Sequence, residues 1–257
     1  MNDFDGGWDS RATLKDGWIE RTPRRPDVDP RLLAEVRLMP WLAPRLPLAV
    51  PVPELVSSDP LVVRHRLVPG IPLTSPTAEH GRALGLFLRA LHDTDVHEAT
   101  AHGLRDIRDE FAEDLALFRG RVLPLLSGPE RAAGAALLDA LDTGVTDTVV
   151  HGDLGPEHVL VEDGRLSGVI DFGDAHAGDP AIDLSWTLYG TPPAFAEALA
   201  TAYGVTPELR ARGLLWHSLG PWYEVTRGQT TDDPAMQATG LEAVRSRLTL
   251  LPGEART

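Results

Sequence analysis

The sequence predicts an α+β fold with a small, β-rich front part and a larger, mostly helical back part. Three observations lead to this prediction. An Asp-Gly turn signal at Asp16-Gly17 lies between two short strand-like runs. Apolar residues then recur at helical spacing over 77–142 and again from 183 to about 250. Between the helical zones, a second Asp-Gly signal at Asp163-Gly164 predicts an inserted hairpin. A chain of 257 residues is one large domain or two small ones.

The front part is rich in proline and carries short strand signals. Residues 11–22 read as a hairpin around Asp16-Gly17, and Pro30 opens a helix over 31–42, at the first-turn position where proline is tolerated. Residues 46–56 are apolar and interrupted by proline, which favours an extended segment. A strand over 61–68 should end at Pro69-Gly70. We place the lobe boundary so that 1–72 form the front lobe and 73–257 the back lobe.

The back part should begin with three helical stretches. The first contains Leu84, Phe87, Leu88 and Leu91, the second runs over 107–126, and the third over 129–141. Strand character returns at 148 and continues through the hairpin of 159–170. Helices resume after Asp183, with breaks expected near Gly204 and Gly228.

Composition removes several classes of protein. The chain has no cysteine, which excludes a disulfide scaffold, a Cys-ligated zinc protein and a thiol enzyme. Its formal net charge of −14 disfavours nucleic acid and anionic membranes as partners and favours cationic ligands. No apolar run reaches transmembrane length, and the first nine residues show no signal-peptide core. We therefore expect a cytoplasmic protein that binds neither nucleic acid nor membrane, and the sequence leaves its oligomeric state open.

The most informative segment runs from His151 to His158 and is followed, one hairpin later, by Asp171-Phe-Gly-Asp174. A turn centred between residues 163 and 164 would pair Val159 with Gly168, which puts His158 and Asp171 at the open end of one hairpin. Asp153 lies on the loop that feeds this end. Because burying unpaired polar groups is costly, their convergence indicates chemistry rather than packing. Phosphoryl transfer uses such a set: an aspartate on a His-x-Asp loop, a ligand five residues later and an Asp-Phe-Gly aspartate.

With these motifs, the chain resembles the aminoglycoside phosphotransferase family of antibiotic kinases, and its pattern is nearest to the macrolide phosphotransferase branch. The resemblance covers nearly the whole chain. It rests on the His-Gly-Asp-Leu loop, Val-Ile-Asp-Phe-Gly-Asp and Gly178-Asp-Pro-Ala-Ile-Asp183 in the back part, and on the segments around Gly6, Arg21, Glu35, Trp41 and Arg66 in the front part. It implies a bilobal, protein-kinase-like fold and transfer of a γ-phosphate from ATP or GTP to a hydroxyl of an aminoglycoside, a macrolide or a related natural product. It also implies a role in antibiotic resistance.

The resemblance implies a role for each motif residue. Asp153 would take or orient the proton of the acceptor hydroxyl, so it is the catalytic candidate. Asp171 and His158 would hold Mg²⁺. Many members have asparagine where this chain has His158, and a neutral imidazole can also offer a nitrogen to a metal. For His158 the alternative is a core histidine bonded to the backbone.

The front lobe departs from the usual kinase pattern at its lysine. Kinases pair a strand lysine with a helix glutamate to position the phosphates, but Lys15 adjoins the turn and cannot take this position. Arg21 takes the strand position instead and should pair with the helix glutamate, Glu35. The alternative is that Arg21 belongs to a surface cluster with Arg24 and Arg25. Further nucleotide contacts are implied at Gly7, Ser10, Arg66 and Leu67. Only five residues precede Gly6, so we expect either a late start of the sequence or a front lobe without its first strand.

The acceptor site should lie between the catalytic loop and the helices after residues 105 and 210. The first of these helices carries an acidic cluster, and the second carries aromatic and acidic residues: Asp109, Glu110, Glu113 and Asp114, and Trp216, Trp222, Tyr223 and Glu224. Such a mixture suits an amino sugar, because carboxylates pair with ammonium groups and aromatic faces cover sugars. The substrate-binding candidates chosen from it are Asp109, Glu113, Trp222 and Glu224. The competing interpretation is that the acids form a solvated helix face and that the tryptophans are core. His151 should anchor the catalytic loop, and Asp179 and Asp183 should brace its backbone.

Two other functions compete with a small-molecule kinase. A metal-dependent hydrolase could use His151, Asp153, His158, Asp171 and Asp174 as a bare metal cluster, but it leaves the front strands without a purpose. A kinase-like module that binds ligand without transferring phosphate would fit the shortened front and the arginine in place of lysine. The retained Asp153 and Asp171 argue against that module.

Overall fold

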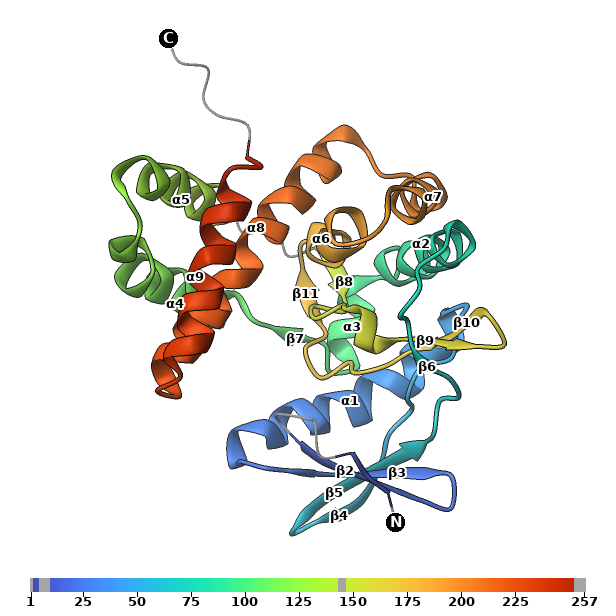
Figure 1. Ribbon diagram of the computed structural model, residues 1–257. Coiled ribbons are helices and arrows are strands. Elements are labelled where there is room, and N and C mark those ends of the chain that lie inside the picture. Colours follow the sequence, from blue (N-terminus) through green and yellow to red (C-terminus); the bar gives the residue numbers. More distant parts are fainter. Residues whose placement is uncertain (1, 5–9, 143–146, 252–257) are drawn as a thin grey trace.

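The computed structural model describes residues 2–4, 10–142 and 147–251, and it divides into two lobes (Figure 1). The front lobe is a five-stranded antiparallel sheet in the order β1-β2-β3-β5-β4, with helix α1 packed on it. Its elements are β1 (Asn2–Phe4), β2 (Ser10–Lys15), β3 (Trp18–Pro23), α1 (Asp29–Leu42), β4 (Glu54–Ser58) and β5 (Leu61–Arg66).

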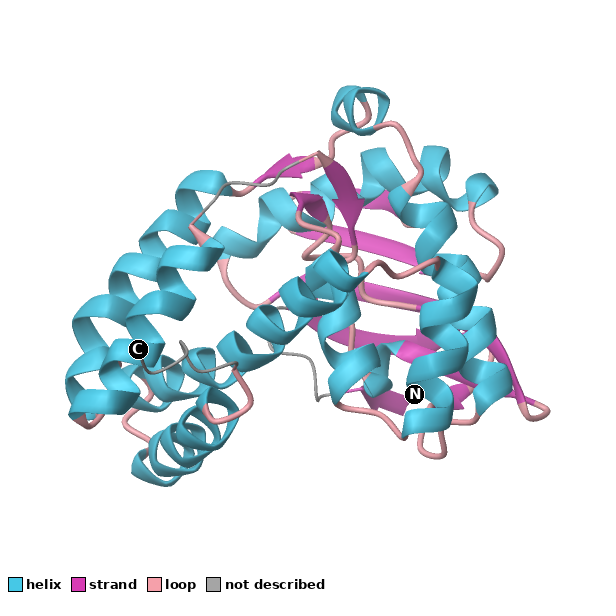
Figure 2. Cartoon of the chain, turned by 90° about the horizontal axis from the view of Figure 1, so that it is seen from above, coloured by secondary structure: helices cyan, strands magenta, loops and turns pink. Residues whose placement is uncertain are grey.

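The back lobe contains two small three-stranded sheets surrounded by helices, as the view from above shows (Figure 2). One sheet has the order β10-β9-β6 and the other β7-β11-β8. The strands are β6 (Ile71–Pro72), β7 (Arg105–Asp106), β8 (Thr148–Val150), β9 (Val159–Glu162), β10 (Arg165–Val169) and β11 (His176–Gly178). The helices are α2 (Ala78–His92), α3 (Val96–Ala101), α4 (Arg108–Arg121), α5 (Gly128–Leu141), α6 (Ala181–Tyr189), α7 (Pro193–Tyr203), α8 (Pro207–Thr230) and α9 (Pro234–Leu248).

Both predicted hairpins form. Asp16 and Gly17 have φ of 52° and 76°, and Asp163 and Gly164 have φ of 50° and 75°, the left-handed pair that joins antiparallel strands tightly. The predicted register of the second hairpin is wrong by one residue at its open end. Val159 pairs with Val169 rather than Gly168, because a bulge between Leu166 and Gly168 shifts β10.

The first strand of the front lobe is present. Residues Asn2–Phe4 pair with 12–14 of β2, which corrects the expectation of a front lobe without this strand. Gly6 and Gly7, the predicted phosphate-covering glycines, lie outside the described residues.

Most helix predictions agree with the structure, and one helix begins earlier than predicted. Helix α1 begins at Asp29, two residues before the predicted start, because Pro30 fits inside its first turn. The break predicted near Gly228 is found at 231–233, between the end of α8 at Thr230 and the start of α9 at Pro234. Gly228 itself lies in the last turn of α8. A Cβ at Gly228 would approach the backbone nitrogen of Gln237 to 2.5 Å, so this glycine serves the close packing of α8 on α9. Gly204, by contrast, ends α7 with φ of 83° as predicted.

Three apolar cores hold these elements. One joins the lobes, running from Leu38, Met39 and Leu42 of α1 through α2 and the strands beneath the catalytic loop to α7. A second lies among α4, α5, α8 and α9, and a small third core lies between α1 and β5. The segments 151–158 and 171–174 therefore pack on the core that joins the lobes. Within the described ranges, no helix combines the length and apolar character needed to cross a membrane.

Candidate active site

The site lies in a cleft of about 1170 Å³ between the lobes. Its walls come from α1, α4, α8 and the loops that follow β8 and β10. Sequence candidates that line it are Ser10, Arg21, Glu35, Asp153, His158, Asp171, Asp179 and Glu224. Residues more than 200 positions apart in the sequence thus share one cavity.

The catalytic loop is held from below by Asp183. Its carboxylate accepts the backbone N–H of His151 at 2.7 Å and that of Gly152 at 2.9 Å. Gly152 has φ of 86°, and a Cβ there would come within 2.5 Å of the Asp174 carbonyl, so only glycine fits. The predicted role of Asp183 as a brace of the loop backbone is confirmed.

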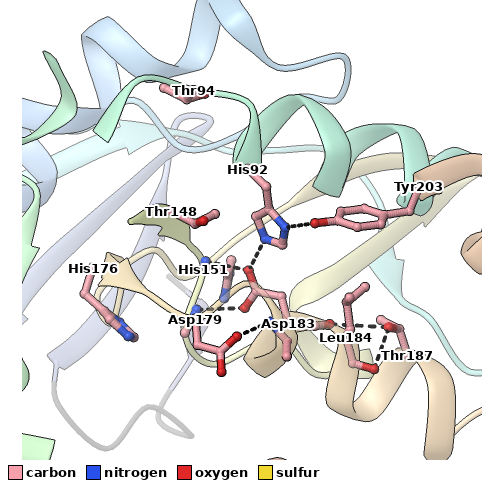
Figure 3. Close-up of polar contacts among 12 residues, drawn as sticks. His92, Thr94, Thr148, His151, His176, Asp179, Asp183, Leu184, Thr187 and Tyr203 are labelled. Carbon is pink, nitrogen blue, oxygen red and sulfur yellow. Dashed lines mark hydrogen bonds and ion pairs between the residues drawn. The ribbon is translucent and has the colours of Figure 1, made fainter. Parts of the chain in front are cut away.

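A buried chain of hydrogen bonds continues from Asp183 to two more helices (Figure 3). His92 Nε2 lies 3.0 Å from the Asp183 carboxylate, and His92 Nδ1 lies 2.8 Å from the Tyr203 hydroxyl. Because a carboxylate only accepts, Nε2 donates to it, and Nδ1 accepts from the tyrosine. Burial raises the pKa of Tyr203 to about 12, so its proton stays in place. Burial also acts to raise the pKa of Asp183, but the bonds from His92 and the backbone hold it below its usual range.

His151 is a packed loop anchor, as predicted. Its Nε2 donates to the Ile170 carbonyl at 3.0 Å, and its Nδ1 accepts the Asp153 N–H at 3.3 Å. The ring is fully buried and lies 4.8 Å from the Phe172 ring, centroid to centroid. With both nitrogens bonded to the chain itself, His151 has no lone pair for a metal, which argues against the bare metal cluster of a hydrolase.

Asp153 follows this anchor and presents its carboxylate to the cleft. The residue is exposed at the cleft surface, yet the surrounding chain desolvates the carboxyl enough to raise its pKa, although the neighbouring His158 acts to lower it. A carboxylate whose proton affinity is raised and which faces an open cavity is suited to accept a proton from a bound hydroxyl.

His158 and Asp171 fit a divalent cation. His158 Nδ1 lies 2.7 Å from the Asp153 carbonyl oxygen and donates to it, which leaves the Nε2 lone pair open. That Nε2 lies 3.7 Å from Asp171 Oδ2, a separation that two ligands of one metal ion can have. Asp171 has a backbone φ of +67°, which is a strained conformation for a residue other than glycine. Asp171 lines the cleft.

Arg21 joins the front lobe to this carboxylate. Its Nη1 donates to both oxygens of Glu35, at 2.7 and 3.0 Å, its Nε donates to Ser10 Oγ at 3.1 Å, and its Nη2 lies 3.9 Å from Asp171. The predicted pairing of Arg21 with Glu35 is therefore present, and the alternative of a surface cluster is wrong. Although the Asp171 side chain is 51% exposed, the surrounding chain desolvates its carboxyl, which acts to raise its pKa; Arg21 and His158 outweigh this and lower the pKa.

Arg66 and Leu67 lie at the crossing between the lobes but do not line the cleft. The Arg66 guanidinium stacks on Trp18, 3.9 Å from the ring centre, and β-strand alternation puts it on the opposite face of the sheet from Arg21. The Leu67 N–H donates to the Gly17 carbonyl at 3.0 Å. A nucleotide contact at these two residues stays a prediction.

Asp179 has a different role from the one predicted. Its carboxylate accepts from the Ala181 N–H at 3.0 Å, from Trp216 Nε1 at 2.7 Å and from Arg212 Nε. It therefore fixes the start of α6 against α8 rather than bracing the catalytic loop itself.

The acceptor wall is made by neighbours of the predicted residues. Trp222 is fully buried in the core among α4, α5, α8 and α9, so its ring cannot contact a molecule in the cleft. Asp109 and Glu113 are exposed on α4 but do not line the cleft. These three assignments are corrected. The wall contains the candidate Glu224 and four other members of the two predicted clusters, Glu110, Asp114, Trp216 and Tyr223, together with Phe111.

Helical spacing divides the acids of α4 into two pairs, and the structure shows which pair lines the cleft. Glu110 and Asp114 are four residues apart on α4 and so share a face, whereas Asp109 and Glu113 share the next face round. Phe111 packs on Trp216 with ring centres 5.2 Å apart, which joins α4 to α8. Burial raises the pKa of Asp114, partly offset by its hydrogen bond with Tyr223.

Comparison with known proteins agrees with this geometry. Residues 2–216 match the family model described as the phosphotransferase enzyme family, APH. The chain belongs to this phosphotransferase family. Viomycin phosphotransferase of Streptomyces vinaceus is 35% identical over 218 residues, which are 79% of this chain and 68% of that protein. An uncharacterized protein of Bacillus subtilis, YcbJ, is 28% identical over 67% of this chain and 63% of its own length. The chain thus spans just under two thirds of one of these relatives and slightly more of the other.

Solved phosphotransferases share the whole fold. The macrolide 2'-phosphotransferase MphH of Brachybacterium faecium is 27% identical, with a TM-score of 0.72 over 99% of this chain and 92% of that one. The GDP and kanamycin complex of an aminoglycoside phosphotransferase gives a TM-score of 0.81 at 22% identity, over 97% of this chain and 93% of that one. The predicted kinase-like, bilobal fold is confirmed.

Proposed function

We propose that this phosphotransferase moves the γ-phosphoryl group of ATP or GTP to a hydroxyl of a small, cationic, hydroxylated molecule such as an antibiotic. The observation that carries the proposal is the convergence of Asp153 with the His158–Asp171 pair and the Arg21–Glu35 pair in one cleft. Viomycin phosphotransferase, 35% identical, supports an antibiotic as the acceptor.

The residues divide the reaction between them. The acceptor oxygen attacks the γ-phosphorus, its proton passes to the Asp153 carboxylate, and the bond from the γ-phosphorus to the bridging oxygen breaks, so that the nucleoside diphosphate leaves with that electron pair. Arg21, held by Glu35, would pair with phosphate oxygens through its fixed guanidinium. Asp171 and His158 would hold Mg²⁺, which neutralises phosphate charge when bound.

Charge supports a cationic acceptor. Asp114 and Glu224 line the wall that α4 and α8 contribute, where the Phe111–Trp216 pair offers aromatic surface. Glu110 lines the same wall, but both of its oxygens accept from Arg105 Nη2, at 2.7 and 2.8 Å. Carboxylates around an aromatic pair suit an ammonium group on a ring or peptide scaffold. The overall charge of −14 acts in the same direction at long range.

A nucleotide-consumption screen tests the proposal. Purified protein is incubated with Mg²⁺ and either ATP or GTP against a panel of aminoglycosides, macrolides and cationic peptide antibiotics, and products are read by mass spectrometry. We expect acceptor-dependent nucleoside diphosphate and a phosphorylated acceptor. Nucleotide binding without a phosphorylated product from any acceptor would favour a ligand-binding module.

The metal assignment has its own test. Asp171→Ala removes the carboxylate next to His158 and should abolish the strengthening of nucleotide binding by Mg²⁺. Calorimetric titration of nucleotide with and without Mg²⁺ measures this, and Asp163→Ala, in the exposed hairpin turn, is the control. An unchanged Mg²⁺ effect in Asp171→Ala would contradict the assignment.

A further inference from the structure

A second ion pair crosses between the lobes, one helical turn from Glu35. Arg31 of α1 donates from Nη1 to Asp174 Oδ1 at 2.7 Å, joining residues 143 positions apart. The two side chains are 34% and 43% exposed, so the pair lies at the surface of the cleft, which both residues line. It connects the front-lobe helix to the last residue of Asp171-Phe-Gly-Asp174.

Asp174 is in turn connected to the catalytic loop through its backbone. Its carbonyl accepts from Nδ1 of His176 at 2.7 Å. The His176 ring is buried and packs against Gly152, where a Cβ would lie only 2.9 Å from that nitrogen. Gly152 precedes Asp153, so a displacement of Asp174 would press on the residue beside the proposed base.

Helix α1 therefore contacts both ends of the segment 171–174. Glu35 holds Arg21, whose Nη2 lies 3.9 Å from Asp171 at one end. Arg31, four residues earlier on the same face of the helix, binds Asp174 at the other end. Two points of attachment fix both the position and the rotation of a short segment, whereas one leaves it free to pivot.

The pair also faces the acceptor wall. The charge of Arg31 acts on Asp114 of α4, and the charge of Asp174 acts on Tyr223 of α8. The front lobe, the segment 171–174 and the acceptor wall therefore come together around Arg31 and Asp174.

We propose that the Arg31–Asp174 pair is an interlobe latch that positions the segment 171–174 for phosphoryl transfer. This inference rests on the proposed function for its catalytic consequence. Arg31 and Asp174 are positioning residues: they act on Asp171 and Asp153 through the backbone and through α1. Opening the pair lets the segment pivot about Asp171 and lowers the fraction of molecules in which Asp171 and Asp153 are aligned.

The test is a double-mutant cycle with two readouts. Arg31→Gln, Asp174→Asn and the double variant are compared with wild type in amide hydrogen exchange over 171–176 and in kcat and KM of the full-length enzyme. Because partly exposed ion pairs change equilibria modestly, we expect each single variant to accelerate exchange and to lower kcat about two- to fivefold, with acceptor KM nearly unchanged. The effect of the double variant should fall well short of the two single effects combined, since the Arg31–Asp174 contact is lost in both singles, while the action of Arg31 on Asp114 is lost only with Arg31.

The matched control is Arg64→Gln. Arg64 pairs with Glu54 at 2.6 Å with similar exposure, 38% and 52%, but within the front-lobe sheet. It should leave exchange over 171–176 and kcat unchanged. Wild-type exchange in Arg31→Gln, or additive effects in the double variant, would overturn the latch. Absence of turnover in wild type would instead refute the proposed function, while the exchange measurement would still decide whether the latch exists.

Discussion

At the scale of single residues, the site is built from side chains whose hydrogen-bonding capacity is almost fully assigned. The Asp183 carboxylate accepts hydrogen bonds from two backbone N–H groups and from His92. Both ring nitrogens of His151 are hydrogen-bonded to the backbone. Asp153, at the surface of the cleft, is different, because its carboxylate faces the cavity. Fixed neighbours around an accessible carboxylate are what a positioned proton acceptor requires.

His217, which does not line the cleft, should contribute to the loss of stability in acid. Burial and the charge of Arg247 lower the pKa of His217 from 6.5 to about 4. The unfolded chain therefore takes up this proton at higher pH than the folded chain does. Its contribution to stability is complete above about pH 6.5 and is lost as the pH falls toward 4.

We expect His217→Gln to flatten the decline in the free energy of unfolding between pH 6.5 and 4, by about 1–2 kcal/mol after allowance for solvent screening. Urea unfolding at several pH values measures this, with His97→Gln on the exposed side of α3 as control. An identical pH profile in His217→Gln and wild type would show that this histidine is protonated alike in both states.

At the scale of elements, helix α8 both lines the cleft and packs on α9. One face supplies Trp216, Tyr223 and Glu224 to the cleft, and another packs on α9 through Gly228. The acceptor wall is therefore only as rigid as the α8–α9 contact behind it.

Gly228→Ala should destabilise the protein. Its Cβ would meet backbone atoms of Gln237 at 2.5 Å, which a flexible side chain cannot relieve, so we expect a loss of about 1–3 kcal/mol. Gly120→Ala in α4 meets open space and should be neutral or gain about 0.5–1 kcal/mol from helix propensity. Thermal and urea unfolding compare the two, and equal stabilities would mean that α8 and α9 do not pack this closely.

The sequence predicts those parts of the site that have local signals. The spacing of Asp153, His158 and Asp171 and the Asp-Gly turns identify the catalytic hairpin, and the strand and helix positions of Arg21 and Glu35 identify their pair. Contacts made by folding leave no such signal. His92 and Tyr203 reach Asp183 from helices far away in the chain, and the bulge in β10 follows from its contact with Ala49, which bonds residues 167 and 169. The choice of Asp109 and Trp222 failed because acidity and aromaticity do not reveal which helix face is buried.

At the scale of the whole molecule, two arginines of the front lobe, Arg21 and Arg31, reach carboxylates of the back lobe, Asp171 and Asp174. Arg21 contacts Ser10, Glu35 and Asp171, so one guanidinium connects β2, β3, α1 and the catalytic segment. A lysine, with a single charged nitrogen, cannot keep this set.

We expect Arg21→Lys to weaken nucleotide binding about tenfold, with a small change in melting temperature. Calorimetric titration of Mg²⁺–nucleotide measures it, and Arg11→Lys, an exposed strand residue nearby, is the control. Full affinity in Arg21→Lys would mean that only the positive charge matters at this position.

The most direct test of the whole account is the comparison of wild type with Asp153→Asn in two assays on the same preparations: nucleotide binding by calorimetry and phosphorylation of an accepted substrate by mass spectrometry. The account predicts nearly equal nucleotide affinity and turnover lower by about 10²–10⁴-fold, because the amide cannot accept the hydroxyl proton. Turnover equal to wild type in Asp153→Asn would contradict the account, since the carboxylate assigned as proton acceptor would then have no part in the reaction.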